Sequence, residues 1–303
     1  MKRIVQRIMP DGTVLYLAPF HLSMEGMETV VLCRDEEDYD AMVKIICVSA
    51  KRKNVIVVIY AVVSNHCHVA LLAASQEDAE AYGSELKKIY SMWFSKKYRE
   101  KRTLRSVNVK AIPLSNDWHV RNALAYIPRN ALDNGCNVYQ YSWSGFRAMF
   151  GGDKGDKAIK VSALSKRDAL EIMHTGINLD DAPWFLDREW HLVPSSFCDC
   201  AYLEQVFSND QSFFMKTIGA LNSADMKNQL VDAPRMMKSD GEFYKSVQDV
   251  CLRWYQTELS TIPEEKKIRL LLYIYHIMKT TVPQLSRVFG IPRERIVEIL
   301  KQA

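Results

Sequence analysis

The chain of 303 residues lacks the features of a disulfide-stabilised or membrane-anchored protein. Its seven cysteines are odd in number and contain no C-x-x-C pair, which argues for reduced thiols. The close pair Cys198 and Cys200 has no second cluster with which to complete a zinc site. No apolar run reaches the roughly 18 residues of a transmembrane helix, and the basic N-terminus lacks the apolar stretch of a signal peptide. We therefore expect a soluble, cytoplasmic protein with no membrane partner.

The net charge is small, +4, but basic residues are concentrated in one stretch. Between residues 87 and 110, four aromatic residues and the single acid Glu100 accompany nine basic residues: Lys87, Lys88, Lys96, Lys97, Arg99, Lys101, Arg102, Arg105 and Lys110. Such a mixture suits the phosphates and bases of a nucleic acid, so we predict DNA-binding residues here. The alternative is a helix that buries its aromatic residues and exposes a solvated basic face.

Hydrophobic periodicity predicts alternating strands and helices in the first part of the chain. Runs of β-branched and aromatic residues predict strands over 13–22, 54–63, 66–72 and 105–112. Helical spacing predicts helices over 35–49, 75–98 and from Asn116 or Asp117 onward. The order β-α-β-β-α-β-α favours an α+β fold, a ferredoxin-like antiparallel sheet with helices on one face and the other face open.

Glycine and charge replace the apolar pattern after residue 150, which indicates a domain boundary. We expect a first domain over 1–150, an irregular linker region over 151–200 and an α-helical domain over 201–303. The apolar spacing over residues 281–302 predicts a helix-turn-helix. Gly290 follows its first helix, and Pro292 begins its second helix. The second helix, with Arg293 and Arg295 on its outer side, could enter a major groove, although many small helical bundles share this outline without touching DNA.

Two histidines separated by a single residue follow the apolar run 55–63. Side chains alternate along a strand, so His66 and His68 are expected to face the same side. Two imidazoles can hold a divalent metal, and a third ligand would make the site catalytic. The alternative is an ordinary surface or packed pair. Four other histidines have no companions in the sequence that suggest ligands, namely His21, His174, His191 and His276.

The helix expected after residue 117 carries residues that suit such a site. Tyr126 and Asn130 lie four positions apart and so share a face, where Asn130 could offer an amide oxygen to a metal and Tyr126 a phenolic oxygen as nucleophile. His119 lies on the same helical face. Pro128 removes one helical hydrogen bond and can kink the helix, at a cost of about 3 kcal/mol. The alternative nucleophiles are Tyr90, Tyr139 and Tyr141.

Together these residues resemble the HUH single-tyrosine transposases, especially the REP-associated tyrosine transposases. That family carries His-hydrophobic-His on a strand, commonly after Asn, as in 65–68, and Tyr-Ile-x-x-Asn on a later helix, as in 126–130. Residues 141–147 are similar to the Ser-Ser-Tyr/Phe-Arg segment that follows in these proteins. The resemblance covers residues 13–150. Here Ala131, rather than the usual Pro, follows the Asn.

The resemblance implies an enzyme that cleaves and rejoins DNA. A divalent ion, Mg²⁺ or Mn²⁺, held by His66, His68 and Asn130 would neutralise charge at the scissile phosphate. Tyr126 would attack phosphorus and form a 5′-phosphotyrosine intermediate, a step that a free 3′-hydroxyl can reverse.

The partner implied is single-stranded DNA at a hairpin or palindrome, and the protein would be a monomer or homodimer associated with the nucleoid. One alternative is a non-catalytic, sequence-specific DNA-binding protein, a domesticated transposase that works through its helix-turn-helix. Another is a metalloenzyme that acts on a small molecule.

Overall fold

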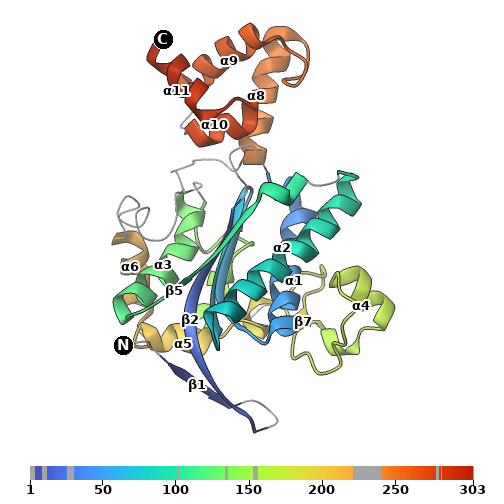
Figure 1. Cartoon of the computed structure of the whole chain (residues 1–303), viewed down its shortest axis with the longest axis vertical. Coiled ribbons are helices and arrows are strands. Elements are labelled where there is room, and N and C mark those ends of the chain that lie inside the picture. The colour runs from blue at the N-terminus through green and yellow to red at the C-terminus, as the bar shows by residue number, and fades with distance from the viewer. Residues whose placement is uncertain are drawn as a thin grey trace.

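The computed structural model describes residues 4–8, 12–25, 31–100, 103–133, 136–152, 156–220, 240–277, 280 and 282–302. Its larger part is built around a curled antiparallel sheet (Figure 1). The strands of this sheet are β1 (Val5–Ile8), β2 (Val14–Glu25), β3 (Ile56–Val63), β4 (His66–Ala73) and β5 (Asn108–Pro113). Four of them lie in the order β5-β2-β4-β3 with every neighbouring pair antiparallel, and β1 pairs with the first residues of β2. The α+β class is confirmed, and the predicted strands and helices follow in the predicted order from β2 onward, whereas β1 was not predicted.

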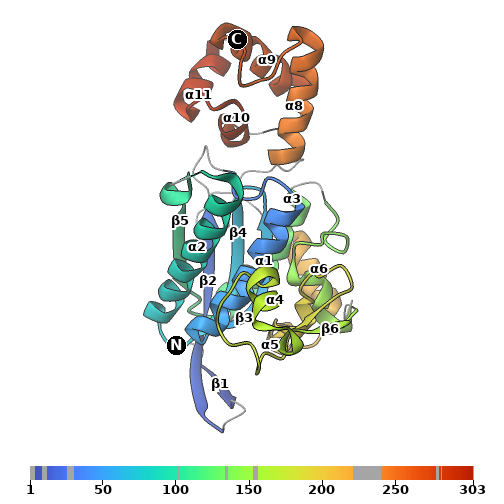
Figure 2. The ribbon, with the colours of Figure 1, turned by 90° about the vertical axis from the view of Figure 1, so that its right-hand side faces the viewer.

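Helices cover both faces of this sheet, as Figures 1 and 2 show. On one face, α1 (Glu36–Lys53) and α2 (Gln76–Tyr98) pack against the side that carries Leu22 and Val69. On the other face, α3 (Asp117–Asp133), α5 (Cys200–Val206) and α6 (Gln211–Ala220) pack against the side that carries Ile59 and Leu72. The expectation of helices on one face alone is therefore wrong. β3 and β4 are apolar on both sides, and burying both sides removes more apolar surface from water.

Residues 156–220 belong to this first body and are not a linker. They include β6 (Ile159–Lys160), α4 (Lys166–Ile172) and β7 (Phe185–Leu186), and buried Val161, Met173 and Trp184 join the core under α1 and α2. The helices α5 and α6 add Leu203 and Phe214 to the core under α3. The predicted boundaries at 150 and 200 are thus wrong. The apolar residues of 156–199 lie in loops and short elements without a regular period, and the helical pattern after 201 does not show against which core α5 and α6 pack. The 3₁₀ helices are η1 (Thr103–Ser106), η2 (Gly145–Gly151), η3 (Val161–Ala163) and η4 (Pro194–Ser196).

Four described helices near the C-terminus form a separate core above one end of the sheet (Figures 1 and 2). They are α8 (Asp240–Tyr255), α9 (Glu264–Ile277), α10 (Val282–Phe289) and α11 (Arg293–Gln302). Leu285 and Phe289 of α10 and Ile296 of α11 are buried together in this core. Gly290 has φ +67°, a conformation that glycine adopts without strain, and it ends α10. The predicted pair of helices is confirmed over 282–302, whereas residue 281 lies outside the described residues; DNA contact stays a prediction.

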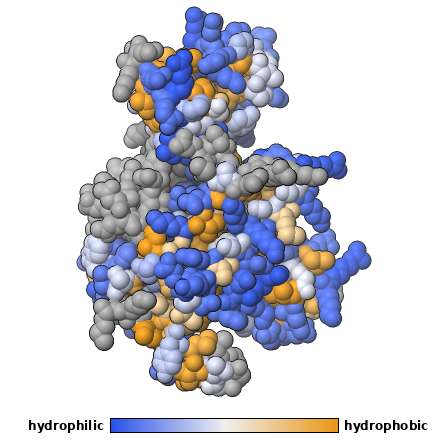
Figure 3. All heavy atoms as spheres, in the orientation of Figure 1, coloured by the Kyte–Doolittle hydropathy of each residue, from blue (hydrophilic) through white to orange (hydrophobic). Residues whose placement is uncertain are grey.

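Among the described residues, no helix has both the length and the hydropathy needed to cross a bilayer. On the face shown in Figure 3, hydrophobic residues form small patches that hydrophilic residues separate.

Gly83 marks a close approach of α2 to the sheet. A Cβ at this position would lie 2.5 Å from Cγ1 of Val109 and 2.7 Å from Cδ1 of Leu22. We expect Gly83→Ala to lower the free energy of unfolding by about 2 kcal/mol, because an added carbon overpacks the helix–sheet contact. Urea denaturation measures this change. As a control, Gly219→Ala in α6 meets no atom within 4 Å and should be neutral or slightly stabilising. Equal effects of the two substitutions would contradict the close approach.

Candidate active site

The sheet face under α3 carries two adjacent histidines. His66 and His68 project from β4 with their ring centroids 4.8 Å apart, and they are 5% and 0% exposed. Cys67 between them points to the opposite face and packs in the core under α1 and α2. The expectation that the two histidines share a face is confirmed. They are buried, however, because this face is covered.

α3 places Tyr126 and Asn130 against this pair. Asn130 Oδ1 lies 3.1 Å from His66 Nε2, and the Tyr126 ring packs edge-on to His68 at 5.3 Å between centroids. α3 continues through Pro128 to Asp133 as one helix. The amide Nδ2 of Asn130 donates to the carbonyl oxygens of Tyr126 and Ile127, at 3.1 and 3.0 Å. These two bonds fix the amide so that its oxygen faces His66.

His21 also belongs to this cluster, contrary to our expectation that it has no companions. It projects from β2, which pairs with β4, and its ring stacks on His68 at 5.0 Å. The same ring lies edge-on to Tyr126 at 6.2 Å. His119 of α3 is close enough to lower the pKa of His21, although burial is the larger cause. Sequence alone gave no local signal for His21, because its role depends on which strands are neighbours.

Burial favours the neutral form of two imidazoles in this cluster, those of His21 and His68. Burial lowers the pKa of His21 to about 3. Burial, and then the rings of His66 and His21, hold the pKa of His68 well below its ordinary value. Neither ring nitrogen of His68 has a hydrogen-bond partner among the described residues. A buried polar group in this state costs about 1–3 kcal/mol, so His68 is suited to a ligand that is supplied from outside.

The alternative tyrosines have other environments. Tyr90 is buried in the core under α1 and α2, where its hydroxyl donates to the carbonyl oxygen of Leu32. The Tyr141 hydroxyl donates to the carbonyl oxygen of Val62, and Tyr139 is 50% exposed. Of the four tyrosines considered, Tyr126 is the one whose ring packs against His68.

The basic helix α2 lies on the opposite face of the sheet from His66 and His68. Its aromatic residues Tyr90 and Phe94 are fully buried, so they are core residues and not a stacking surface for bases. Lys87 donates to the carbonyl oxygen of Val107. For these residues the alternative reading, a helix with buried aromatic residues, is confirmed.

Lys97 is held by carboxylates of the same body. Its Nζ lies 2.6 Å from Asp35, 2.8 Å from Asp38 and 2.9 Å from Glu37. Burial alone would lower the pKa of Lys97, but the hydrogen bonds to these three carboxylates raise it above its ordinary range. Lys97 is therefore a poor candidate for phosphate binding.

The remaining predicted DNA-binding residues are dispersed. Lys88 and Lys96 line an open groove between α2 and α4, and Arg99 ends α2. Lys101 and Arg102 lie outside the described residues, and Arg105 lies in η1. On α11, Arg293 is half-buried, and exposed Arg295 forms an ion pair with Glu298. Their contact with DNA stays a prediction.

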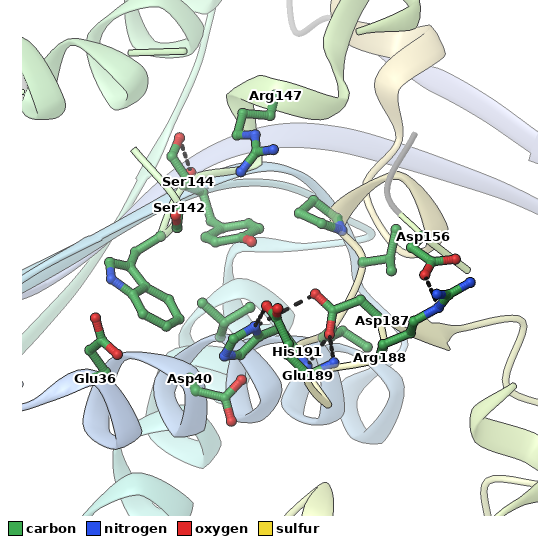
Figure 4. Close-up of a pocket in the computed structure, with 16 residues that line it drawn as sticks. Glu36, Asp40, Ser142, Ser144, Arg147, Asp156, Asp187, Arg188, Glu189 and His191 are labelled. Carbon is green, nitrogen blue, oxygen red and sulfur yellow. Dashed lines mark hydrogen bonds and ion pairs between the residues drawn. The ribbon is translucent and has the colours of Figure 1, made fainter. Parts of the chain in front are cut away.

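A second group with metal-ligand side chains lines another groove (Figure 4). Ligand atoms of Asp187, Glu189 and His191 lie within 4.8 Å of one another, so the expectation that His191 has no companions is wrong. The backbone amides of Glu189 and His191 both donate to Asp187 Oδ1. This turn explains the grouping without a metal, and the side chains of Glu189 and His191 are exposed.

No protein-family model, curated protein or solved structure matches this chain. A functional interpretation therefore rests on the residues of the site themselves.

The buried histidines should make stability depend on pH. In the unfolded chain, His21 and His68 would titrate near pH 6.5, far above their folded pKa values. Below that pH the unfolded state binds more protons than the folded state. The stabilisation that comes from keeping these two histidines neutral is therefore complete above about pH 7 and is lost as the pH falls. Near pH 5, we expect each of these two histidines to lower the free energy of unfolding by about 1.4 kcal/mol for every unit by which the pH falls.

Urea denaturation between pH 4.5 and 7.5, with EDTA to exclude metals, measures this slope. His21→Phe keeps an aromatic ring in the stack and should lower the slope of the unfolding free energy against pH by the contribution of one histidine. An unchanged slope would contradict a buried, neutral His21.

Proposed function

We propose that this protein is a metal-dependent HUH single-tyrosine DNA transposase, which cleaves and rejoins single-stranded DNA near hairpins. One observation carries the proposal: α3 places Tyr126 and Asn130 directly against His66 and His68 of β4. The order β5-β2-β4-β3 with antiparallel neighbours is also the arrangement expected of a ferredoxin-like sheet, which supports the same family.

The donor set fits a divalent cation. It combines two imidazoles with one amide oxygen, a mixture that several divalent metals accept. His68 is neutral and its buried nitrogens have no partner in the described part of the chain. We assign His66 Nε2, His68 and Asn130 Oδ1 as the ligands of Mg²⁺ or Mn²⁺. When bound, such an ion would supply charge neutralisation at the scissile phosphate.

Tyr126 is the proposed nucleophile. Its phenolic oxygen would bond to phosphorus while the bond from phosphorus to the 3′-oxygen breaks, and the phenolic proton would end on the released 3′-hydroxyl. The reverse reaction with another 3′-hydroxyl joins strands. Tyr126 is 3% exposed and His68 is fully buried, so a DNA strand reaches them only after the surrounding parts rearrange.

We expect a covalent protein–DNA adduct when the protein is incubated with Mn²⁺ and a labelled single-stranded hairpin. Denaturing electrophoresis separates this adduct from bound DNA. Tyr126→Phe should abolish it, because the substitution removes the attacking oxygen and keeps the ring. His66→Ala and His68→Ala should each lower the yield of the adduct at least about 100-fold. Loss of a residue that only hydrogen-bonds to a metal ligand lowers metal affinity or activity by up to about 100-fold, and loss of a ligand itself should cost at least as much. The matched control Tyr139→Phe, at an exposed tyrosine, should leave the yield unchanged.

The other outcomes separate the alternatives. An adduct that persists in Tyr126→Phe would contradict the assigned nucleophile. DNA binding without an adduct, in both Mg²⁺ and Mn²⁺, would favour the non-catalytic DNA-binding protein that works through α10 and α11. Absence of any affinity for DNA would favour a metalloenzyme that acts on a small molecule.

A further inference from the structure

A long groove lies between α2 and α4, on the opposite side of the sheet from Tyr126. Figures 1 and 2 show α4 on the same side of the sheet as α1 and α2. The groove has a volume of about 920 Å³, and residues of α2 from Glu85 to Lys97 line it. At a rise of about 1.5 Å per residue, this stretch of α2 is about 18 Å long, or roughly three helical turns. The groove is therefore long enough to take several turns of another helix.

Two large aliphatic side chains are exposed in this groove. Met92 of α2 is 65% exposed, and Leu170 of α4 is 58% exposed. Ile89 and Trp93 lie on the same face of α2 as Met92, and both are half-buried against the core. Apolar side chains that gather in one place and have polar residues around them mark a site of interaction more often than scattered ones do.

The groove also contains three cations that have no ion-pair partner in the described part of the chain. Lys88 and Lys96 lie four positions before and after Met92 on α2, and Arg167 lies three positions before Leu170 on α4. Residues three or four positions apart are neighbours on the surface of a helix. Each exposed aliphatic side chain therefore has a basic neighbour on its own helix.

The acidic residues of the groove do not balance these cations. Glu85 forms an ion pair with Arg52 at 2.8 Å, and Glu37 forms one with Lys97 at 2.9 Å, so both carboxylates are already neutralised. Glu171 is the remaining acid of the groove, and it has no ion pair among the described residues. Three unpaired cations and one unpaired carboxylate leave the groove positive, and its charge is complementary to that of an acidic partner.

An acidic protein segment fits this groove better than a single-stranded nucleic acid does. Such a nucleic acid binds by stacking its bases on aromatic rings. The ring of Trp93 is already stacked on Tyr90, with 5.6 Å between centroids, and Lys97 Nζ lies 5.2 Å from its centroid. The ring of His174 packs against the same indole at 5.7 Å. The side chains that are exposed are aliphatic, and they suit the apolar residues of a peptide.

We propose that the groove between α2 and α4 binds an acidic amphipathic helix of a partner protein. A helix that docks in a groove presents apolar residues at positions i, i+3, i+4 and i+7. This apolar face would cover Met92 and Leu170, and carboxylates beside it would approach the three unpaired cations. The inference does not rest on the proposed function, because the groove and Tyr126 lie on opposite sides of the sheet.

Selection from a peptide library tests the charge of the partner. The library displays helices of about 14 residues, or four turns, with leucine fixed at the apolar positions and glutamate, lysine, serine or alanine elsewhere. We expect the full chain to enrich glutamate over lysine. The variant Lys88→Glu/Lys96→Glu/Arg167→Glu should enrich lysine instead, because like charges repel across an interface. The same ratio of glutamate to lysine with both proteins would overturn the inference.

A fluorescein-labelled peptide from this selection then tests the apolar contacts by fluorescence anisotropy. Met92→Ser and Leu170→Ser should each weaken its binding at least about tenfold, because each removes an apolar contact that the peptide covers. The matched controls are Leu252→Ser, at a side chain of α8 that is 44% exposed, and Lys166→Glu, at an exposed lysine of α4 outside the groove. Both controls should bind the peptide like the native protein. Native affinity in Met92→Ser and Leu170→Ser would contradict the proposed groove.

Two further measurements complete the test. Since all the substituted side chains are exposed, urea denaturation should give every variant the native free energy of unfolding. An oligonucleotide of thymidines should leave the labelled peptide bound to the native protein. Displacement of the peptide by this oligonucleotide would assign the groove to a nucleic acid and overturn the inference.

Discussion

Burial of both faces of β4 is the constraint on which the rest of the site depends. Cys67 faces the core under α1 and α2, while His66 and His68 face α3. Since α3 covers them, water does not satisfy the nitrogens of His68, and burial favours the neutral form of that ring. The protein must therefore satisfy these imidazoles with its own amides or with a ligand. His66 has amide partners on both sides, and His68 has none in the described residues.

The side-chain amides of Asn65 and Asn130 lie beside the two ring nitrogens of His66 and so hold the ring in one orientation. Asn130 is fixed by the backbone of α3, so its oxygen always faces Nε2. Asn65 lies 2.9 Å from Nδ1 on the other side of the ring, and Arg287 of α10 contacts Asn65 in turn. The ring of His66 is therefore held between an element of the first body and a residue that the C-terminal helices contact.

Local patterns in the sequence were sufficient for the order of elements, for the shared face of His66 and His68, and for Tyr126 and Asn130. In each case the residues lie on one strand or one helix, where spacing determines direction. His21 could not be found in this way, because it joins the site through the pairing of β2 with β4. Trp184 enters the core from a segment without a regular period, which is why its region was taken for a linker. Phe214 lies on a predicted helix, but helical spacing does not show which body that helix packs against. Arg287 acts across two bodies, and no spacing indicates that contact.

A closed site of this kind reconciles stability with reactivity. A phosphotyrosine-forming site that stayed open would expose a bound metal and a nucleophile to every single strand in the cell. In the proposed reaction Tyr126 must meet a DNA strand, yet it is 3% exposed and lies under α3. The burial that favours a neutral His68 therefore also keeps the proposed nucleophile covered until the parts around it rearrange.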